Sequence, residues 1–442
     1  MTNKAVGSFF AILFVSKILA IYFTNFNLFG DEAQYWLWSK DLDLGYYSKP
    51  PFLSWFISLY TAIFGESFFS LKIFPSFIYI LIGLVIYDLG KNVGLNTKSA
   101  ILCSLLFLFI PAVSFSSFII STDLFLLLFW TLSLNLLVKI VNKPKIEFFI
   151  LLGIMLGLAM LSKYAAIYFL LCLIIYFFFD EQFRRIVITN YFGAFLCLFI
   201  MIMVVFPNIL WNLNNGWVTL QHTSDNANFN NIQVNFFRGL VFILTQIVMV
   251  GPVLFIANVI NYKKITIDKN KKILLVFSIP IFVVVCFEAI IVRANANWAA
   301  PALVSLFLFL YINIAEAKFY FIKLNIFFNF LFCIIFFILI GTSYPSSIFH
   351  RIKDLDTYAS GVMLEAKKLG INNFVISDRL LFASFNYELK DYKKSHNLNF
   401  YMPHKNGEKI TNHFKLTSPL NKNMDKSFIF IGYGSGFYWL CF

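Results

Sequence analysis

The chain has 442 residues, of which 60% are hydrophobic and 13% are charged. Soluble globular domains carry about 25% charged residues, and here a 20% aromatic content adds more apolar surface than one core could bury. This composition excludes an ordinary soluble enzyme and predicts a protein that has bilayer lipid as the solvent for most of its surface. The net charge of +13 would suggest a nucleic-acid partner in a soluble chain, so the distribution of the charge decides its meaning.

Eleven apolar stretches are long enough to be transmembrane helices, which need about 20 residues each. They predict an all-α polytopic membrane protein and cover residues 6–28, 69–89, 99–119, 124–141, 146–161, 165–179, 186–207, 236–260, 273–292, 299–314 and 324–343. No small-residue cleavage site follows the first stretch, so we expect a retained helix and no signal peptide. The six cysteines match neither a disulfide framework nor a metal site, because five of them lie inside apolar stretches.

Lysine and arginine are unevenly divided between the loops that join these stretches. If the N-terminus is cytoplasmic, the short outer loops hold little more than Lys40, Lys49, Lys163 and Arg293, whereas the short inner loops hold 15 lysine and arginine residues. This asymmetry predicts a cytoplasmic N-terminus and accounts for much of the positive charge without any nucleic acid. The outer segments are then residues 29–68, 120–123, 162–164, 208–235, 293–298 and 344–442.

Two of the outer segments are predicted to have a structure of their own. In the first outer loop, residues 29–68, short aromatic helices are expected over 31–40 and 50–60, both lying in the plane of the membrane interface. The tail, residues 344–442, has the composition of a soluble domain. Helices over 357–369 and 378–388 alternate with strands over 374–376, 400–402 and 428–431, which predicts a small C-terminal α/β periplasmic domain beside a membrane domain over 1–343.

Acids at the outer membrane surface are the first candidates for chemistry. Asp31 and Glu32 directly follow the first apolar stretch, and Asp123 directly precedes the fourth. Each of them could simply cap a helix, because a carboxylate at a helix N-terminus accepts backbone hydrogen bonds and suits the helix dipole. The first outer loop also contains the run Tyr46 to Lys49. Carboxylates, a cation and aromatic rings at one interface suit a sugar and a phosphate.

Three further polar side chains lie on the same predicted side. Lys163 separates two apolar stretches so closely that it should face protein or a cavity, since cations at membrane depth are costly, although its ammonium could also snorkel to the interface. His222 stands apart from the other histidines, so it supports no metal site, and a lone loop histidine is usually polar surface. Arg293 could contact a lipid phosphate or anchor the neighbouring helix.

Six motifs on this side carry a resemblance to a known family. They are Asp31-Glu32-Ala33; Gly45 to Pro51; Thr122-Asp123; Leu161 to Tyr164; Phe206-Pro207-Asn208 with Trp211-Asn212 and Gly216-Trp217; and Asn297-Trp298 with Pro301. In this order they resemble the GT-C glycosyltransferases of the aminoarabinose transferase and protein O-mannosyltransferase kind. The likeness runs from about residue 7 to residue 345, and Ser377-Asp378-Arg379 resembles the tail of the same bacterial subfamily.

The resemblance implies a GT-C architecture and an inverting enzyme of the bacterial cytoplasmic membrane that takes a sugar from a polyprenyl (undecaprenyl) phosphate donor. The family's first-loop aspartate maps onto Asp31, the expected base, and Glu32 or Asp123 would orient the sugar or the acceptor. Preorganised cations would neutralise the leaving phosphate. Those expected here are Lys49, Lys163 and Arg293. The other expected substrate contacts are Tyr46, Tyr47, Pro50, Tyr164, Trp211, His222, Asn297 and Trp298.

One departure from the family concerns metal binding. Many relatives have an acidic residue directly before the lysine or histidine of the proline motif, whereas this chain has Ser48. A divalent metal held at that position is therefore not expected, and no other cofactor is implied.

The sugar and the acceptor stay open at this stage. By subfamily likeness, lipid A or another lipopolysaccharide component ranks before the hydroxyl of a protein acceptor. A transporter of lipid-linked sugars would also carry polar residues on one side, but transporters usually hold ionisable groups near the midplane of discontinuous helices. Here the apolar stretches look unbroken and the acids lie at their outer edge. A scaffold protein would not need such a polar cluster.

Overall fold

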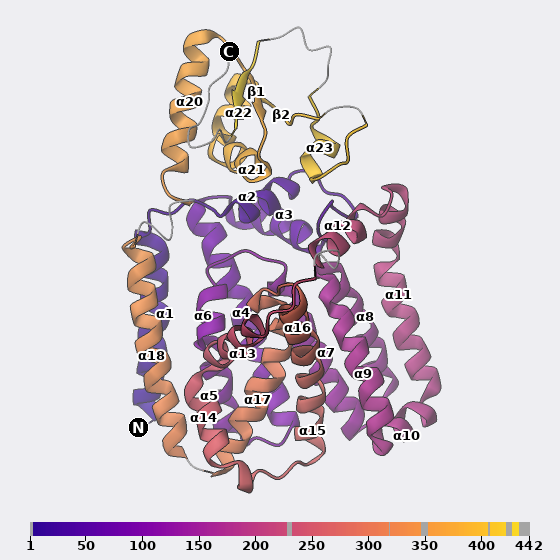
Figure 1. Cartoon of the computed structure of the whole chain (residues 1–442). Coiled ribbons are helices and arrows are strands. Elements are labelled where there is room, and N and C mark those ends of the chain that lie inside the picture. Colours follow the sequence, from indigo (N-terminus) through magenta and orange to yellow (C-terminus); the bar gives the residue numbers. More distant parts are fainter. Residues whose placement is uncertain are drawn as a thin grey trace.

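The computed structural model describes residues 3–227, 232–317, 319–345, 352–404, 407–420 and 427–432. Long helices form a bundle, and short helices together with a small sheet lie across one end of it (Figure 1). The N-terminus lies at the opposite end. The architecture is therefore mostly helical, as the composition predicted.

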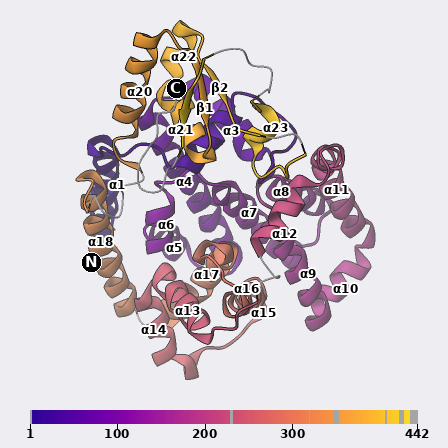
Figure 2. The ribbon, with the colours of Figure 1, turned by 45° about the horizontal axis from the view of Figure 1, so that its top comes forward.

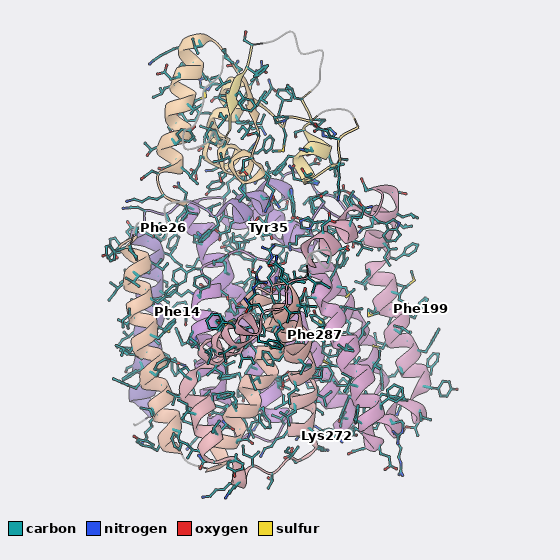
Figure 3. All side chains as sticks on the ribbon, in the orientation of Figure 1. Phe14, Phe26, Tyr35, Phe199, Lys272 and Phe287 are labelled. Atoms are coloured by element: carbon teal, nitrogen blue, oxygen red, sulfur yellow. The ribbon has the colours of Figure 1, made fainter. Side chains whose placement is uncertain are left out.

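Six helical segments in the described residues are long and apolar enough to cross a membrane. They are α4 (Phe68–Asn92), α7 (Asp123–Asn142), α11 (Tyr191–Asn214), α15 (Lys269–Val276) continued by α16 (Ile279–Ile291), η3 (Ala296–Ala299) continued by α17 (Ala300–Ala317), and α18 (Phe319–Gly341). Shorter apolar helices accompany them: α1 (Asn3–Phe23), α5 (Thr97–Leu108) and α8 (Ile146–Ser162). Phe199 lies at the outer edge of this bundle (Figure 3), and Phe14 and Phe199 have 40% and 49% of their surface exposed, as suits contact with lipid.

Two of the predicted stretches are broken, so the expectation that the apolar stretches are unbroken is wrong for them. Residues 99–119 form α5 and the short α6 (Pro111–Ser116), and residues 236–260 form α13 (Phe236–Val250) and α14 (Pro252–Ile260), which meet at an angle of 99°. At the second break Pro252 has no N–H to offer the carbonyl of Val248, and Gly251 adopts φ +117°, which side chains disfavour. The count of eleven transmembrane helices stays a prediction.

A second bend of 105° separates α9 (Ile167–Phe179) from α10 (Glu181–Thr189). The single turn η1 (Tyr164–Ala166) leads into α9, and η2 (Tyr262–Lys264) follows α14. Asp180 caps α10, because its side chain accepts a hydrogen bond from the backbone N–H of Phe183. This cap stabilises the sharp change of direction at the end of the bundle that lies away from the tail.

The helices predicted in the first outer loop are present as α2 (Gly30–Trp38) and α3 (Phe52–Phe64). Both lie across the end of the bundle, where α12 (Val218–Ala227) is also found (Figure 1). Parts of two segments predicted to lie outside the membrane, residues 29–68 and 208–235, thus lie at one end of the molecule. Among the aromatic side chains of α2, Trp36 and Trp38 are 4% and 2% exposed, so this helix is packed on several sides.

The tail folds as an α/β unit over α2 and α3 (Figure 2). It contains α20 (Leu355–Leu369), β1 (Asn373–Ile376), α21 (Arg379–Glu388), α22 (Lys390–His396), β2 (Asn399–Tyr401), α23 (His413–Thr417) and β3 (Ile429–Ile431). The parallel sheet has the order β2-β1-β3, with Phe374 opposite Phe400 and Val375 opposite Phe430. All four residues of β1 are buried, as expected of a central parallel strand. The predicted helices and strands of the tail are confirmed to within about two residues.

Candidate active site

A cavity of about 530 Å³, which we call the lysine cavity, opens beneath the first outer loop. Its polar lining contains residues that the sequence placed far apart, namely Ser48, Lys49, Lys163, Tyr164, His222, Thr223 and Glu288. Pro50 and Trp298 also line it, and its apolar wall includes Ile167, Val284, Phe287 and Ile291. Six of the predicted site residues therefore meet around one space.

Tyr46 fixes the turn that presents Lys49 to this cavity. The ring of Tyr46 is fully buried and stacks on Trp38 with 4.5 Å between ring centroids. Its hydroxyl donates to the carbonyl of Trp38 at 3.0 Å, and its backbone N–H donates to the carbonyl of Lys49 at 3.1 Å. The structure therefore corrects the expected substrate contact at Tyr46, because this side chain belongs to the packed support of the loop.

Trp211 supports the same loop from the other side. Its indole N–H donates to Asp43 Oδ2 at 2.6 Å, and a Cβ at Gly45 would lie only 2.4 Å from its ring. Gly45 is thus required by the close approach of the loop to the indole. Trp211 is 8% exposed and does not line the lysine cavity. We therefore correct its expected role from sugar contact to loop support.

Asp123 and Lys163 form an ion pair between the lysine cavity and a second cavity. Lys163 Nζ lies 2.6 Å from Asp123 Oδ1, and the amide of Asn297 donates to Asp123 Oδ2 at 2.9 Å. Asp123 and Asn297 line the second cavity of about 460 Å³, the aspartate cavity. Asp123 also lies in the first turn of α7, where Thr122 is the N-cap residue, so its carboxylate suits the helix dipole and pairs with Lys163 as well.

Lys49 lies among the other charged side chains of the site, a cluster that comprises Lys163, Asp123, Asp31 and Arg379. Burial lowers the pKa of its ammonium to about 8, and the neighbouring charge of Lys163 acts in the same direction. The charges of Asp123, Asp31 and Arg379 also act on Lys49. Burial likewise lowers the pKa of His222, with further contributions from Lys49 and Arg379, so that its imidazole is neutral at pH 7.

Asp31 lies at the edge of this cluster and is paired with a residue of the tail. Its carboxylate is 59% exposed, and Oδ1 lies 3.1 Å from Arg379 Nη1. Arg379 stands at the start of α21 and also donates to Gln34 Oε1 at 2.7 Å. Asp31 is therefore accessible to a substrate, and the tail supplies one cation to the site.

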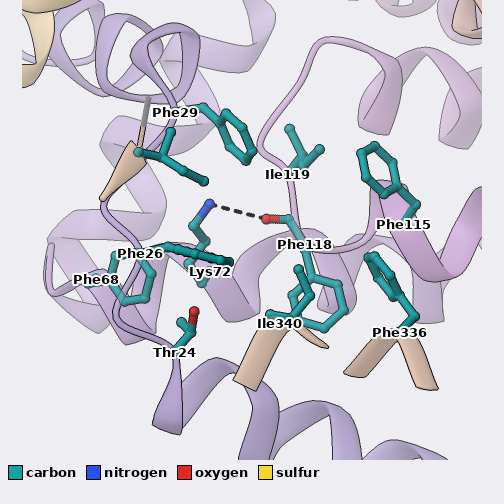
Figure 4. A pocket seen from close by; sticks show the side chains of 11 residues that line it. Thr24, Phe26, Phe29, Phe68, Lys72, Phe115, Phe118, Ile119, Phe336 and Ile340 are labelled. Carbon is teal, nitrogen blue, oxygen red and sulfur yellow. Dashed lines mark hydrogen bonds between the residues drawn. The ribbon is translucent and has the colours of Figure 1, made fainter. Parts of the chain in front are cut away.

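Glu32 has different surroundings from those expected. It is fully buried, its Oε2 lies 2.5 Å from Lys72 Nζ, and it accepts hydrogen bonds from the backbone N–H groups of Phe29 and Ile120, each at 2.8 Å. Lys72 reaches on to the carbonyl of Phe118 at 3.3 Å, and it lines a small apolar pocket of about 30 Å³ (Figure 4). Because Glu32 lines neither the lysine nor the aspartate cavity, we propose that it positions the loop before Asp123 and takes no part in chemistry.

The remaining predicted residues fall into two groups. Tyr164 and Tyr47 are near the cluster: the Tyr164 hydroxyl donates to Asn208 Oδ1 at 2.7 Å, and the Tyr47 hydroxyl donates to the carbonyl of Ile410 at 3.1 Å. Tyr47 also meets the ring of His222 edge-on. Arg293, in contrast, is exposed and lines neither of these two cavities, so the structure does not bring it to the site.

Sequence reasoning missed Arg379 and Glu288. Arg379 was noted only as part of a family-like fragment, because no local pattern shows that it meets Asp31 across 348 positions. Glu288 had a usable signal, since an ionisable residue inside an apolar stretch is a site candidate by default. In the part of the chain that the structure describes, no three His, Cys, Asp or Glu side chains form a group that could hold a metal ion.

Comparison with known sequences gives two kinds of match. Residues 48–211 match the family model of dolichyl-phosphate-mannose-protein mannosyltransferases. A lipid A galacturonosyltransferase from Rhizobium johnstonii is 30% identical over 298 residues, which are 65% of this chain and 61% of that protein. A lipopolysaccharide core galacturonosyltransferase of the same organism is 26% identical over 48% of this chain and 43% of its own length. The chain therefore spans less than two thirds of the length of these relatives.

Solved structures show the same fold. The ArnT protein of Cupriavidus metallidurans in its apo state superimposes with a TM-score of 0.64 at 13% identity, over 94% of this chain and 87% of that one. Its complex with undecaprenyl phosphate gives a TM-score of 0.65 at 14% identity, over 92% and 87% of the two chains. The solved structures show the fold of this chain, and together with the family-model match and the sequence relatives they support the resemblance to the aminoarabinose transferase and protein O-mannosyltransferase kind that was drawn from the motifs.

Proposed function

We propose that this protein is an inverting glycosyltransferase that moves a sugar from a polyprenyl phosphate donor to lipid A or another lipopolysaccharide component. The observation that carries the proposal is the lysine cavity, where Lys49 and Lys163 stand above an apolar wall formed by residues such as Ile167, Val284 and Phe287. A cation next to an apolar surface is what a phosphate on a long hydrocarbon chain requires. The names of the curated relatives and the undecaprenyl phosphate bound to ArnT support this assignment.

The residues of the cluster can divide the reaction between them. Lys49 binds the donor phosphate and, with Lys163, stabilises the charge that develops on it as the sugar departs. An acceptor oxygen attacks the anomeric carbon from the opposite face, and the bond from that carbon to the phosphate oxygen breaks. The polyprenyl phosphate leaves with the bonding electron pair. Asp31 takes the proton of a hydroxyl acceptor, whereas an ionised phosphate acceptor has no proton to lose and needs Asp31 only for orientation.

The proposal includes a membrane arrangement. We place the N-terminus in the cytoplasm and the end with α2, α3 and the tail in the periplasm, because of the lysine and arginine asymmetry of the loops. In this arrangement about eleven transmembrane helices within residues 1–343 form the catalytic domain of a bacterial inner-membrane protein. Residues 344–442 form the periplasmic α/β domain.

Two alternative functions, a protein O-glycosyltransferase and a transporter of lipid-linked sugars, are each supported by an observation. A protein O-glycosyltransferase of the same fold is favoured by the mannosyltransferase family model over residues 48–211. A transporter of lipid-linked sugars is favoured by the break between α13 and α14 and by Glu288 within α16, because transporters combine discontinuous helices with intramembrane charges. A transporter would not cleave the donor, so the release of polyprenyl phosphate separates it from both transferases.

The test uses the purified full chain in lipid nanodiscs with a radiolabelled polyprenyl phosphate sugar and lipid A. We expect label on lipid A and free polyprenyl phosphate in equal amounts. Lys49→Met should abolish most of this turnover, whereas the control Lys263→Met, in η2 beyond the far end of α14, should leave it unchanged. Transfer to a peptide but not to lipid A would favour the protein acceptor. No cleavage of any donor by a folded protein would refute the proposed function.

A further inference from the structure

We propose that Glu288 selects the sugar of the donor by accepting hydrogen bonds from its hydroxyl or ammonium groups and by excluding sugars that carry a carboxylate. The inference rests on the proposed function, and it adds the chemical class of the transferred sugar. It concerns a residue that lines the lysine cavity but has no role in the mechanism given above.

Glu288 is an ionisable residue in an apolar helix, a position where a carboxylate is expected to have a charged or hydrogen-bonding partner. It lies in the last turn of α16, within the apolar segment Lys269–Ile291, and it lines the lysine cavity with Val284, Phe287 and Ile291. Figure 3 shows Phe287 near the middle of the bundle, on the helix that carries Glu288. The backbone carbonyl of Glu288 accepts from the N–H of Val292 at 2.9 Å, but no hydrogen bond or ion pair joins its side-chain carboxylate to any residue that the structure describes. A carboxylate at such a depth is costly unless something compensates it, so a bound ligand is the natural partner.

The charges around the cavity restrict what this ligand can be. Asp123 pairs with Lys163, and Asp31 pairs with Arg379. His222 is neutral at pH 7 because burial lowers its pKa. Among the described residues that line the cavity, two charged groups then stand outside these ion pairs: the ammonium of Lys49 and the carboxylate of Glu288.

A polyprenyl phosphate sugar carries one negative charge on its phosphodiester, which matches the single ammonium of Lys49. No second unpaired cation lines the cavity in the described residues, so a carboxylate on the sugar would meet Glu288 without compensation. Like charges brought together in a poorly solvated site repel strongly. A sugar with hydroxyl groups or an ammonium, in contrast, supplies the hydrogen-bond donors that Glu288 lacks. The expected specificity therefore differs from that named for the galacturonosyltransferase relatives.

The experiment compares three polyprenyl phosphate donors that carry a neutral hexose, an amino sugar or a uronic acid. Release of polyprenyl phosphate by the full chain is measured for each, alone and in competition. We expect the neutral or the amino donor to react at least about 10-fold faster than the uronic acid donor, since one unfavourable contact of this kind is worth at least about 1.4 kcal/mol. Glu288→Gln should reduce this ratio to within about 3-fold, mainly by faster use of the uronic acid donor. The control Glu181→Gln removes an exposed acid of α10 and should preserve the ratio.

The outcomes are distinct. A uronic acid donor that is preferred by the unchanged protein, or a ratio that is the same with Glu288→Gln, overturns the inference and leaves the proposed function intact. Lack of release from all three donors refutes the proposed function instead. Should Glu288→Gln fold poorly, the competition series on the unchanged protein still ranks the three sugars. Binding of polyprenyl phosphate, which has no sugar, should be equal in the unchanged protein and in folded Glu288→Gln, because Glu288 is expected to contact only the sugar.

Discussion

The buried pair of Glu32 and Lys72 allows a test of whether Glu32 has a structural or a catalytic role. Glu32 is fully buried and accepts from Lys72, from the N–H of Phe29 and from the N–H of Ile120. Glu32→Gln keeps the size of the side chain but replaces one accepting oxygen with an NH₂ group, which must then face a donor. Breaking a buried ion pair from one side costs about 3–5 kcal/mol, and we expect a loss of this size in the free energy of unfolding.

The assay is reversible unfolding in mixed detergent micelles, combined with turnover per folded molecule. Lys72→Met should destabilise the protein to a similar extent, because it leaves Glu32 buried without its cation. The double variant should cost less than the sum of the two single variants by about 1–3 kcal/mol, as expected for residues in direct contact. Donor affinity should stay near its original value in every folded variant. A Glu32→Gln protein that is fully stable but has lost turnover by about 100-fold would refute the structural role and restore Glu32 to the chemistry.

Three further predictions follow from the surroundings of single residues. Asp31→Asn should lower turnover with a hydroxyl acceptor by about 10²- to 10⁴-fold while the donor still binds, and near-normal turnover would show that Asp31 is not the base. Affinity for the anionic donor, measured as a pH series, should fall as the pH rises through about 8, because burial lowers the pKa of Lys49 to that value and the neutral amine no longer attracts phosphate; the same fall in Lys49→Met would contradict this cause. Burial raises the pKa of Glu388 from 4.5 to about 7, with Asp356 contributing, so the folded tail holds this proton to higher pH than the unfolded chain does. Stability should therefore decrease from about pH 4.5 to about pH 7, by at most about 3.4 kcal/mol, and unfolding curves of Glu388→Gln that keep this slope would assign it to another group.

The sequence by itself determined the class of the protein and the region of the site. Apolar stretches and the scarcity of charge predicted the helical bundle, because the bilayer forces backbone polar groups to be satisfied within each helix. The motifs placed Lys49, Lys163 and Trp298 on one side of the membrane, and His222 was expected there as a polar residue of an outer loop; all four line one cavity. Local patterns also sufficed for the tail, where Asp378 caps α21 by accepting from the N–H groups of Leu380 and Leu381.

Only the tertiary structure decided which of these residues face the cavity and which support it. Tyr46 and Trp211 are residue types that often bind sugars, but Tyr46 packs inside the first outer loop and Trp211, on α11, supports that loop. Asp31 and Glu32 are neighbours in sequence, yet on α2 they point to different surroundings, one 59% exposed and one fully buried. Successive residues of a helix are turned by about 100° from each other, so adjacent carboxylates meet different neighbours. Partners such as Lys72 and Arg379 come from distant parts of the chain, and no local pattern records those distances.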